Sequence, residues 1–474
     1  MSSKTNQATI KIAYIGGGSK SWCRKTMTDL ALCEHLTGEI CLYDINYEAA
    51  ARNVKLGEQI FSHPDAKTTF KVTAEKNIGD ALSGADFVVI SISPGPVQMF
   101  ANDLDITLKH GVIHTVGDTV GPAGISRALR AVPIFEEFAR EIMFHCPEAW
   151  VINYTNPMTL CTAALYAVEP HIKAFGCCHE VFGTQGWLAM MVREHRGIEG
   201  VVRQDIKIDV SGLNHFTFFT GATYEGTDVF EDVRWFMERE DFFRDRTENA
   251  LERNKVGRVG SCDGLIQLDF FRRFGVVGAA GDRHLVEFVP WYNSSEDNLH
   301  RWGVSMTKSI HRLGGWNPPA EATEQKRTEK KHKPKPVKTP ESLKRSKEEG
   351  VDQIMALCGI KDLDTNVNIP NVGQNPSVQL GHVVETNAAF RRDRITPMTA
   401  SPLPEALQSC VERVARSQEI TLDAALDRDV DLAFQAVLCD PLVTIDTDRA
   451  WNMFVELLNA NRQMLPGYDI PEVG

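Results

Sequence analysis

The chain has 474 residues, of which 43% are hydrophobic and 24% are charged, and its formal net charge is -12. This length predicts more than one domain's worth of core, and this composition is that of a globular protein and not of a disordered one. The acidic balance argues against a nucleic-acid-binding protein, which would present a basic face, although a local Arg can still bind a small anionic substrate.

The N-terminus and the cysteines bear on the compartment. Residues 1–7 lack the apolar core of a signal peptide, and no apolar run is long enough to span a membrane. The eleven Cys are scattered and odd in number, which favours reduced thiols. We therefore expect a cytoplasmic protein with no membrane partner.

The first predicted unit is a strand, a glycine turn and a helix. Residues 8–15 have the pattern of a buried strand, and residues 22–32 that of a helix. The turn between them brings backbone N–H groups and the positive end of the helix dipole together, which makes a phosphate site. Ser21 replaces the third glycine of the dinucleotide fingerprint, so the match is partial. We expect cofactor contacts from Gly16, Gly17, Gly18 and Ser19.

A second strand is predicted over residues 39–44 and ends in Asp44. An acid at this distance from the glycine turn is expected to bind the ribose. It favours NAD over NADP, because a carboxylate would repel a 2′-phosphate. Asp44 can also begin the helix predicted over residues 46–60, and the two roles are compatible.

Two further strands are predicted over residues 85–93 and 149–153, each followed by a polar loop. The loop after the first begins at Pro94 and offers a place for the nicotinamide ring. The second strand closes on Asn153 and leads to Asn156. Strands that alternate with helices predict a parallel α/β sheet, with the ligand at the carboxyl ends of its strands.

Asp118 lies in a Gly-rich loop over residues 117–124. Such a residue is either an ordinary turn residue or a mobile active-site acid. The helix predicted over residues 125–138 carries Arg127 and Arg130 on one face. That pair is either a solvated surface or part of a wall that binds a carboxylate.

Metal-ligand residue types occur at two places. Cys177 and Cys178 precede His179 and Glu180, and His215 follows an Asn further along the chain. Thiolate and imidazole suit a divalent transition metal, so Cys178 and His215 would form a two-ligand site with open positions if they converge. Alternatively, the two cysteines are small buried core residues.

The pattern changes after residue 200. We expect residues 8–200 to form a Rossmann-like NAD-binding domain, and residues 201–474 to form an α+β domain for substrate binding and oligomerisation. Strands are predicted at 206–214 and 216–221. The helices predicted at 402–419, 422–437 and 451–463 either form an oligomer surface or pack on their own domain.

Three further segments of this second half call for an interpretation. Asp282, Arg283 and His284 follow a glycine, either as a surface turn or with Arg283 gripping a carboxylate in bidentate fashion. Residues 321–349 are rich in Lys, Glu and Pro and are expected to be an exposed insertion, as a solvated loop or a lid. Residues 365–371 are expected to be an ordered polar loop.

Taken together, these motifs resemble glycoside hydrolase family 4, whose members depend on NAD and on a divalent metal. The resemblance covers nearly the whole chain, and the insertion near residue 321 departs from it. It implies a lactate- or malate-dehydrogenase-like architecture. Residues 178–181, with the sequence Cys-His-Glu-Val, resemble the α-galacturonidase branch of that family, as do residues 345–354 and 366–387.

The resemblance implies cleavage of α-galacturonides without net redox change. NAD takes a hydride from C3, so the C2 proton becomes acidic, and manganese or another divalent metal stabilises the enolate as a Lewis acid. The aglycone is then eliminated, water adds, and the hydride returns to C3. This family is an exception to the two-carboxylate rule for glycosidases.

The resemblance also implies roles for residues of this sequence. Cys178 and His215 would bind the metal. Asp118 would be the acid that helps the aglycone leave, and Asp282 the base at C2. The residues implied in sugar binding are Asn153, Asn156, His179, Glu180 and Arg283, with Arg283 holding the uronate. A homodimer or homotetramer is expected.

Other functions stay open on the sequence alone. Within the same family the alternatives are an α-galactosidase or an α-glucuronidase. Outside it, the chain is either an NAD-dependent hydroxy-acid dehydrogenase, in which the Cys178 and His215 pair has no task, or an NAD-binding sensor without turnover.

Overall fold

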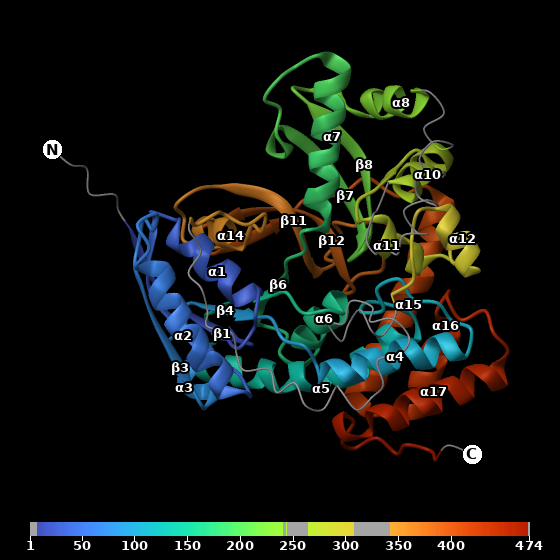
Figure 1. Ribbon diagram of the computed structural model, residues 1–474, viewed down its shortest axis with the longest axis horizontal. Coiled ribbons are helices and arrows are strands. Elements are labelled where there is room, and N and C mark those ends of the chain that lie inside the picture. The colour runs from blue at the N-terminus through green and yellow to red at the C-terminus, as the bar shows by residue number, and fades with distance from the viewer. Residues whose placement is uncertain (1–6, 240–242, 244–263, 308–341, 473–474) are drawn as a thin grey trace, which may run out of the picture.

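The computed structural model describes residues 7–239, 243, 264–307 and 342–472 (Figure 1). Its centre is a nine-stranded sheet with the strand order β13-β12-β11-β6-β5-β4-β1-β2-β3. The first six strands in the chain run parallel to their neighbours and confirm the predicted α/β sheet. They are β1 (Ala8–Ile15), β2 (Leu36–Tyr43), β3 (Phe70–Glu75), β4 (Phe87–Ile90), β5 (Trp150–Asn153) and β6 (Lys173–Gly176).

Helices cover both faces of this sheet because its strands are apolar on both sides. In β1, Ile12 and Tyr14 face the core beneath one layer, and Ala13 and Ile15 face the core beneath the other, as expected from the period of two along a strand. The first layer contains α1 (Trp22–Ala31), α2 (Tyr47–Phe61) and α14 (Gly350–Leu357); the second contains α3 (Ile78–Leu82), α4 (Val97–Lys109), α5 (Gly121–His145) and α6 (Met158–Val168).

The expected polar loop at residues 365–371 is wrong, because most of that segment forms a strand. The strands β11 (Leu363–Pro370), β12 (Val383–Arg391) and β13 (Arg394–Pro397) extend the sheet in antiparallel fashion beyond β6. Asn366 and Asn368 are buried within β11, and Asn366 hydrogen-bonds the carboxyl of Glu385 at 2.9 Å, so the polar sequence here does not mark exposure to solvent. The main sheet therefore contains strands from both sides of the expected boundary at residue 200.

A second, smaller sheet stands beside the first. It is built from β7 (Ile206–Leu213), β8 (Phe216–Tyr224), β9 (Thr227–Asp228) and β10 (Val277–Gly278). Both strands predicted at the start of this region are confirmed. Figure 1 shows α7 and α8 on the upper side of the molecule, next to these strands. The helices of this part are α7 (Glu180–Arg196), α8 (Phe230–Glu238), α10 (Leu265–Phe274), α11 (Asp282–Leu285) and α12 (Glu296–Arg301), with short 3-10 turns at Arg203–Asp205 and Val286–Phe288.

The C-terminal helices return to the first half of the chain. They are α15 (Glu405–Asp427), α16 (Val430–Cys439) and α17 (Thr447–Asn461), followed by a 3-10 turn at Arg462–Met464. Figure 1 shows them beside α4 and α5, and their apolar residues join the core on that face of the main sheet. No helix in the described ranges combines the length and the apolar character needed to cross a bilayer.

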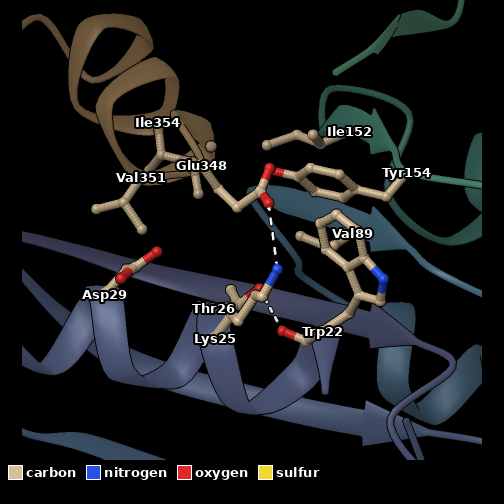
Figure 2. A pocket seen from close by; sticks show the side chains of 11 residues that line it. Trp22, Lys25, Thr26, Asp29, Val89, Ile152, Tyr154, Glu348, Val351 and Ile354 are labelled. Carbon is tan, nitrogen blue, oxygen red and sulfur yellow. Dashed lines mark hydrogen bonds and ion pairs between the residues drawn. The ribbon is translucent and has the colours of Figure 1, made fainter. Parts of the chain in front are cut away.

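The expected exposed insertion at 321–349 is only partly described, since residues 321–341 lie outside the described residues. The remaining part, residues 342–349, is an irregular segment that is exposed at Ser342, Lys344, Arg345 and Lys347 but is anchored by three buried residues. Leu343 packs into the core between α1 and α14, and Glu348 and Glu349 are buried. Figure 2 shows Glu348 reaching Lys25 of α1 beside the rings of Trp22 and Tyr154, at an N–O distance of 3.4 Å.

Candidate active site

A cavity of about 1270 Å³ opens at the carboxyl ends of the parallel strands, where α/β sheets bind their ligands. It runs from the glycine turn after β1 to the loop between β7 and β8. Expected site residues that line it are Gly16, Gly18, Ser19, Asp44, Asp118, Asn156, Cys178, His179, Glu180 and His215. Expected site residues that do not line it are Gly17, Pro94, Asn153, Asp282 and Arg283.

The glycine turn is shaped for a close approach. Gly16 has φ +92°, and a Cβ atom there would lie 2.0 Å from the carbonyl oxygen of Ser91, so only glycine fits. Asp44 accepts hydrogen bonds from the amide of Gly18 at 2.9 Å and from that of Asn46 at 2.8 Å. Asn46, and not Asp44, is the N-cap of α2. Asp44 therefore braces the turn and also faces the cavity.

Asn53, which the sequence analysis did not identify, stabilises the glycine turn. The side-chain amide of Asn53 donates hydrogen bonds to the carbonyls of Gly17 and Ser19, at 2.7 and 2.9 Å. Gly17 itself lies against Leu42 of the sheet, away from the cavity. Pro94 contributes only its carbonyl to the buried Arg130, whereas neighbouring residues of the same loop line the cavity.

A hydrogen-bonded chain joins Asp118 to His215 through Thr119. The Thr119 hydroxyl donates to Oδ1 of Asp118 at 2.8 Å and lies 2.9 Å from Nδ1 of His215. Because its one proton goes to the carboxylate, Nδ1–H of His215 must donate to the Thr119 oxygen. This leaves the lone pair of Nε2 for a ligand. Burial, followed by nearby His284, lowers the pKa of His215 to about 3, so the ring is neutral.

His284 completes a cluster that the sequence did not single out as a site. The ligand atoms of Asp118, His215 and His284 all lie within 4.8 Å of one another. The two imidazole centroids are 3.8 Å apart, and both rings line the cavity. Two imidazoles beside a carboxylate form a donor set that suits a divalent transition metal.

The two adjacent cysteines have different environments. Cys177 is buried in the core between the sheet and α1, as the core interpretation predicts, although it also borders the cavity. Cys178 is 6% exposed and lines the cavity, as the ligand interpretation requires. Burial raises the pKa of the Cys178 thiol well above its usual value, and the nearby carboxylates of Glu385 and Glu180 add to this. In the metal-free protein Cys178 is therefore a thiol.

Glu385 of β12 is a buried carboxyl beneath Cys178 that sequence reasoning missed. It accepts hydrogen bonds from Thr217 at 2.7 Å and from the side chain of Asn366 at 2.9 Å. Asn214 reaches the same carboxyl at 3.5 Å and also hydrogen-bonds the Cys178 thiol. Burial raises the pKa of Glu385. The only available signal was the polar stretch at 366–371, whose burial required the fold.

Glu180 is anchored and does not extend freely into the cavity. Its Oε2 accepts the amide of Gly281 at 3.1 Å, and its Oε1 lies 3.9 Å from Nε2 of His284. Burial alone would raise the pKa of Glu180, but the imidazoles of His284 and His215 and the Gly281 amide lower it overall. Glu180 is therefore an anion, which would repel a uronate carboxylate. His179 lies between two carboxylates: its Nε2 is 3.8 Å from Oε1 of Glu180, and its Nδ1 is 3.6 Å from Oε1 of Glu348.

The two expected asparagines take different places. Asn156 donates its side-chain N–H to Oδ2 of Asp118 at 3.2 Å, and its backbone carbonyl accepts Nε of Arg127 at 2.9 Å. Oδ1 of Asn156 is buried with no hydrogen-bond partner in the described part of the chain, although the residue lines the cavity. This oxygen is free to accept a sugar hydroxyl. Asn153 instead lies under the strand end, where it bonds Thr155 and Thr162.

Asp282 and Arg283 have structural partners away from the cavity. Asp282 is fully buried, and its Oδ1 accepts the amide of Gln267 in the first turn of α10 at 3.0 Å. Nη2 of Arg283 donates to the carbonyl of Thr115 at 2.6 Å and to the hydroxyl of Thr307 at 2.8 Å. Among the described residues, the Lys and Arg side chains that line the cavity are those of Lys20 and Arg127.

Comparison with known proteins places this geometry among sugar-cleaving enzymes. A model described as family 4 glycosyl hydrolase matches residues 11–194, and one for the C-terminal domain of the same family matches residues 210–443. An α-galacturonidase of Thermoanaerobacterium saccharolyticum is 43% identical over 466 residues, which cover 97% of each chain.

Solved structures of similar fold include members described as glycosidases. A Bacillus subtilis protein described as a glucosidase superposes with a TM-score of 0.82 at 41% identity, covering 95% of this chain and 100% of its own. The 6-phospho-β-glucosidase of Thermotoga maritima, crystallised with manganese, NAD+ and glucose-6-phosphate, gives a TM-score of 0.67 at 22% identity, covering 98% and 100%. The second likeness is one of fold.

Proposed function

Because the chain belongs to family 4 of the glycosyl hydrolases, we propose that it is an α-galacturonidase. The observation that carries this proposal is the 43% identity to an α-galacturonidase over 97% of both chains. The Cys-His-Glu-Val sequence at residues 178–181 supports the same substrate class. The cavity that holds these residues is large enough for a nucleotide and a sugar together.

We propose NAD and a divalent metal, with Mn²⁺ as the first candidate, as the cofactors. Gly16 and Asp44 line the same cavity as the imidazoles of His215 and His284, so one cavity offers residues for a nucleotide and for a metal. A Thermotoga maritima protein of this fold was crystallised with both cofactors. When bound, they would accept and return a hydride and stabilise negative charge on the sugar oxygens.

The sugar would lie between the strand ends and the imidazoles. Oδ1 of Asn156 offers an unpaired acceptor for a hydroxyl. Asp118 is oriented by the Thr119 hydroxyl on one oxygen and by Asn156 on the other. We propose that it donates the proton to the departing aglycone. His179 and Glu180 would shape the wall of the sugar site, with Glu180 acting through its neighbours and not on the uronate.

The uronate carboxylate is better matched to Arg127 than to Arg283. Arg127 lines the cavity and directs only its Nε to the carbonyl of Asn156, so its terminal N–H groups have no hydrogen-bond partner among the described residues. Arg283 is held by Thr115 and Thr307. Asp282 is fully buried and does not line the cavity, which argues against its role as the base at C2.

We also propose a homodimer or homotetramer in the cytoplasm. Val372 and Leu380 are 74% and 73% exposed, which supports an interface near the β11–β12 connection. The cysteines of the described residues are all free, which supports a reducing compartment.

The direct test is to incubate the enzyme with a chromogenic α-galacturonide in D₂O, with NAD, Mn²⁺ and a reductant. We expect cleavage with deuterium at C2 of the product, measured by mass spectrometry. Cleavage without that deuterium would contradict the elimination route. Cleavage of the matching galactoside or glucuronide alone would overturn the substrate assignment, and inertness toward all three would overturn the glycosidase proposal.

A further inference from the structure

His284 has the position and the chemistry of a metal ligand. Its ring lines the cavity beside that of His215, with 3.8 Å between ring centroids and 31° between ring planes. One of its ligand atoms lies within 4.8 Å of those of both His215 and Asp118, which is the spacing at which one ion can be shared. Neutral imidazole is a common ligand for divalent transition metals.

The nitrogens of His284 are not committed to the protein. Nδ1 is buried with no hydrogen-bond partner among the described residues, and an unsatisfied buried polar atom is costly unless something binds it. Nε2 lies 3.9 Å from Oε1 of Glu180, which is too far for a hydrogen bond. A cation between the two rings would satisfy a nitrogen that otherwise has no partner.

The surrounding structure holds His284 at this place. The amide of Gly281, at the start of α11, is fixed by Glu180, and Asp282 ties the same helix to the first turn of α10. The carboxylates of Asp118 and Glu180 flank the imidazoles and make the site electrostatically favourable to a cation. Groups that orient a ligand in this way are typical around protein metal sites.

We infer that His284 is a direct ligand of the divalent metal, next to His215, so that the site contains two imidazoles. This inference deepens the proposed function and rests on its metal requirement. It assigns to α11 the role of carrying a ligand. The same helix is held by Glu180, which binds the amide of Gly281 at its start, and by Asp282, which binds the amide of Gln267 in the first turn of α10.

Mn²⁺ binding to the full chain, without sugar, tests the inference by a readout other than activity. Pulsed electron paramagnetic resonance counts the imidazole nitrogens coupled to Mn²⁺, and we expect two in the wild type and one in His284→Gln. A titration of free Mn²⁺ should show that His284→Gln binds at least about tenfold more weakly, since even substitutions of groups that only orient ligands cost about 10–100-fold.

The control is His300→Gln, because His300 lies on α12, outside the cavity lining and outside the cluster. Its Mn²⁺ affinity should stay within about twofold of wild type, well below the 10–100-fold cost of disturbing a ligand shell. A single coupled imidazole in the wild type would overturn the inference even if His284→Gln failed to fold. No binding of Mn²⁺ by the wild type would overturn the proposed metal requirement itself.

Discussion

The hydroxyl of Thr119 lies 2.9 Å from Nδ1 of His215 and gives its own proton to Asp118. One small side chain therefore sets the tautomer of a proposed metal ligand and the orientation of a proposed acid. Neither relationship is visible in the sequence, because 96 positions separate Thr119 from His215.

Thr119 offers the first prediction. Thr119→Val keeps the shape but removes the hydroxyl, so Nδ1 of His215 loses its acceptor and the ring is free to rotate or change tautomer. We expect Mn²⁺ affinity to fall about 10–100-fold. Thr119→Ser keeps the hydroxyl and should bind within a few-fold of wild type. Equal affinities for the Val and Ser variants, in the same titration of free Mn²⁺, would show that the hydroxyl has no such task.

A second prediction concerns the two arginines. Arg127→Gln should lower kcat/KM for an α-galacturonide far more than for the matching galactoside, because only the former carries a carboxylate; a charged hydrogen bond contributes about 1.5–3 kcal/mol, or roughly 10–150-fold. Arg283→Gln should affect both substrates equally, since Arg283 binds Thr115 and Thr307. If Arg283→Gln, and not Arg127→Gln, lowered kcat/KM selectively for the galacturonide, Arg283 would be the residue that binds the uronate.

The third prediction concerns the proposed role of Asp118 as the acid that protonates the leaving group. Asp118→Asn cannot donate a proton, so we expect kcat to fall about 10²–10⁴-fold on galacturonides with poor leaving groups and much less on nitrophenyl substrates. A series of aryl galacturonides with graded leaving-group pKa values measures this dependence. A uniform loss across the series would assign Asp118 to positioning alone.

The nucleotide turn allows a matched pair of glycine variants. Gly16→Ala would place a methyl group 2.0 Å from the Ser91 carbonyl, in a backbone conformation with φ +92°. We expect NAD binding, followed by fluorescence or calorimetry, to be lost. Gly186→Ala adds the same atom on α7, where nothing lies within 4 Å, and should leave NAD affinity unchanged. Normal NAD binding by Gly16→Ala would place the nucleotide elsewhere.

Asp440 carries a pH dependence of stability. Burial raises its pKa from 3.8 to about 6, although the amides of Leu442 and Gly121 bond the carboxylate. The folded state therefore binds a proton that the unfolded state has released, and stability decreases as pH rises from about 4 to 6. Relative to Asp440→Asn, the free energy of unfolding should fall by about 2 kcal/mol between pH 4 and pH 7. If denaturant unfolding gave the same pH dependence of the unfolding free energy for wild type and Asp440→Asn, the prediction would be wrong.

Much of the nucleotide half could be predicted from the sequence because its signals are local. The strand at Ala8–Ile15 and the turn at Gly16 could be predicted because an apolar run, a glycine turn and a helix are consecutive in the chain. Asp44 was readable for the same reason, although its bond to Gly18 was not.

The other half of the site depends on contacts between distant segments. Cys178 and His215 were chosen by residue type, but the sequence could not separate Cys178 from Cys177. Both border the cavity, and only the fold shows that Cys177 packs in the core beside Tyr154 while Cys178 lies near Glu180 and Glu385. Asn366 looked like loop because polarity predicts exposure, whereas here it serves a buried carboxyl on the neighbouring strand.

The sequence by itself determined the α/β class and the glycine turn, since each depends on neighbours a few positions apart, and it supplied residue types that suit the proposed metal site. The tertiary structure alone decided that Asp282 and Arg283 support the fold while His284 faces His215. Three consecutive residues of a short helix point in different directions, and which of them meets the cavity is set by where that helix docks.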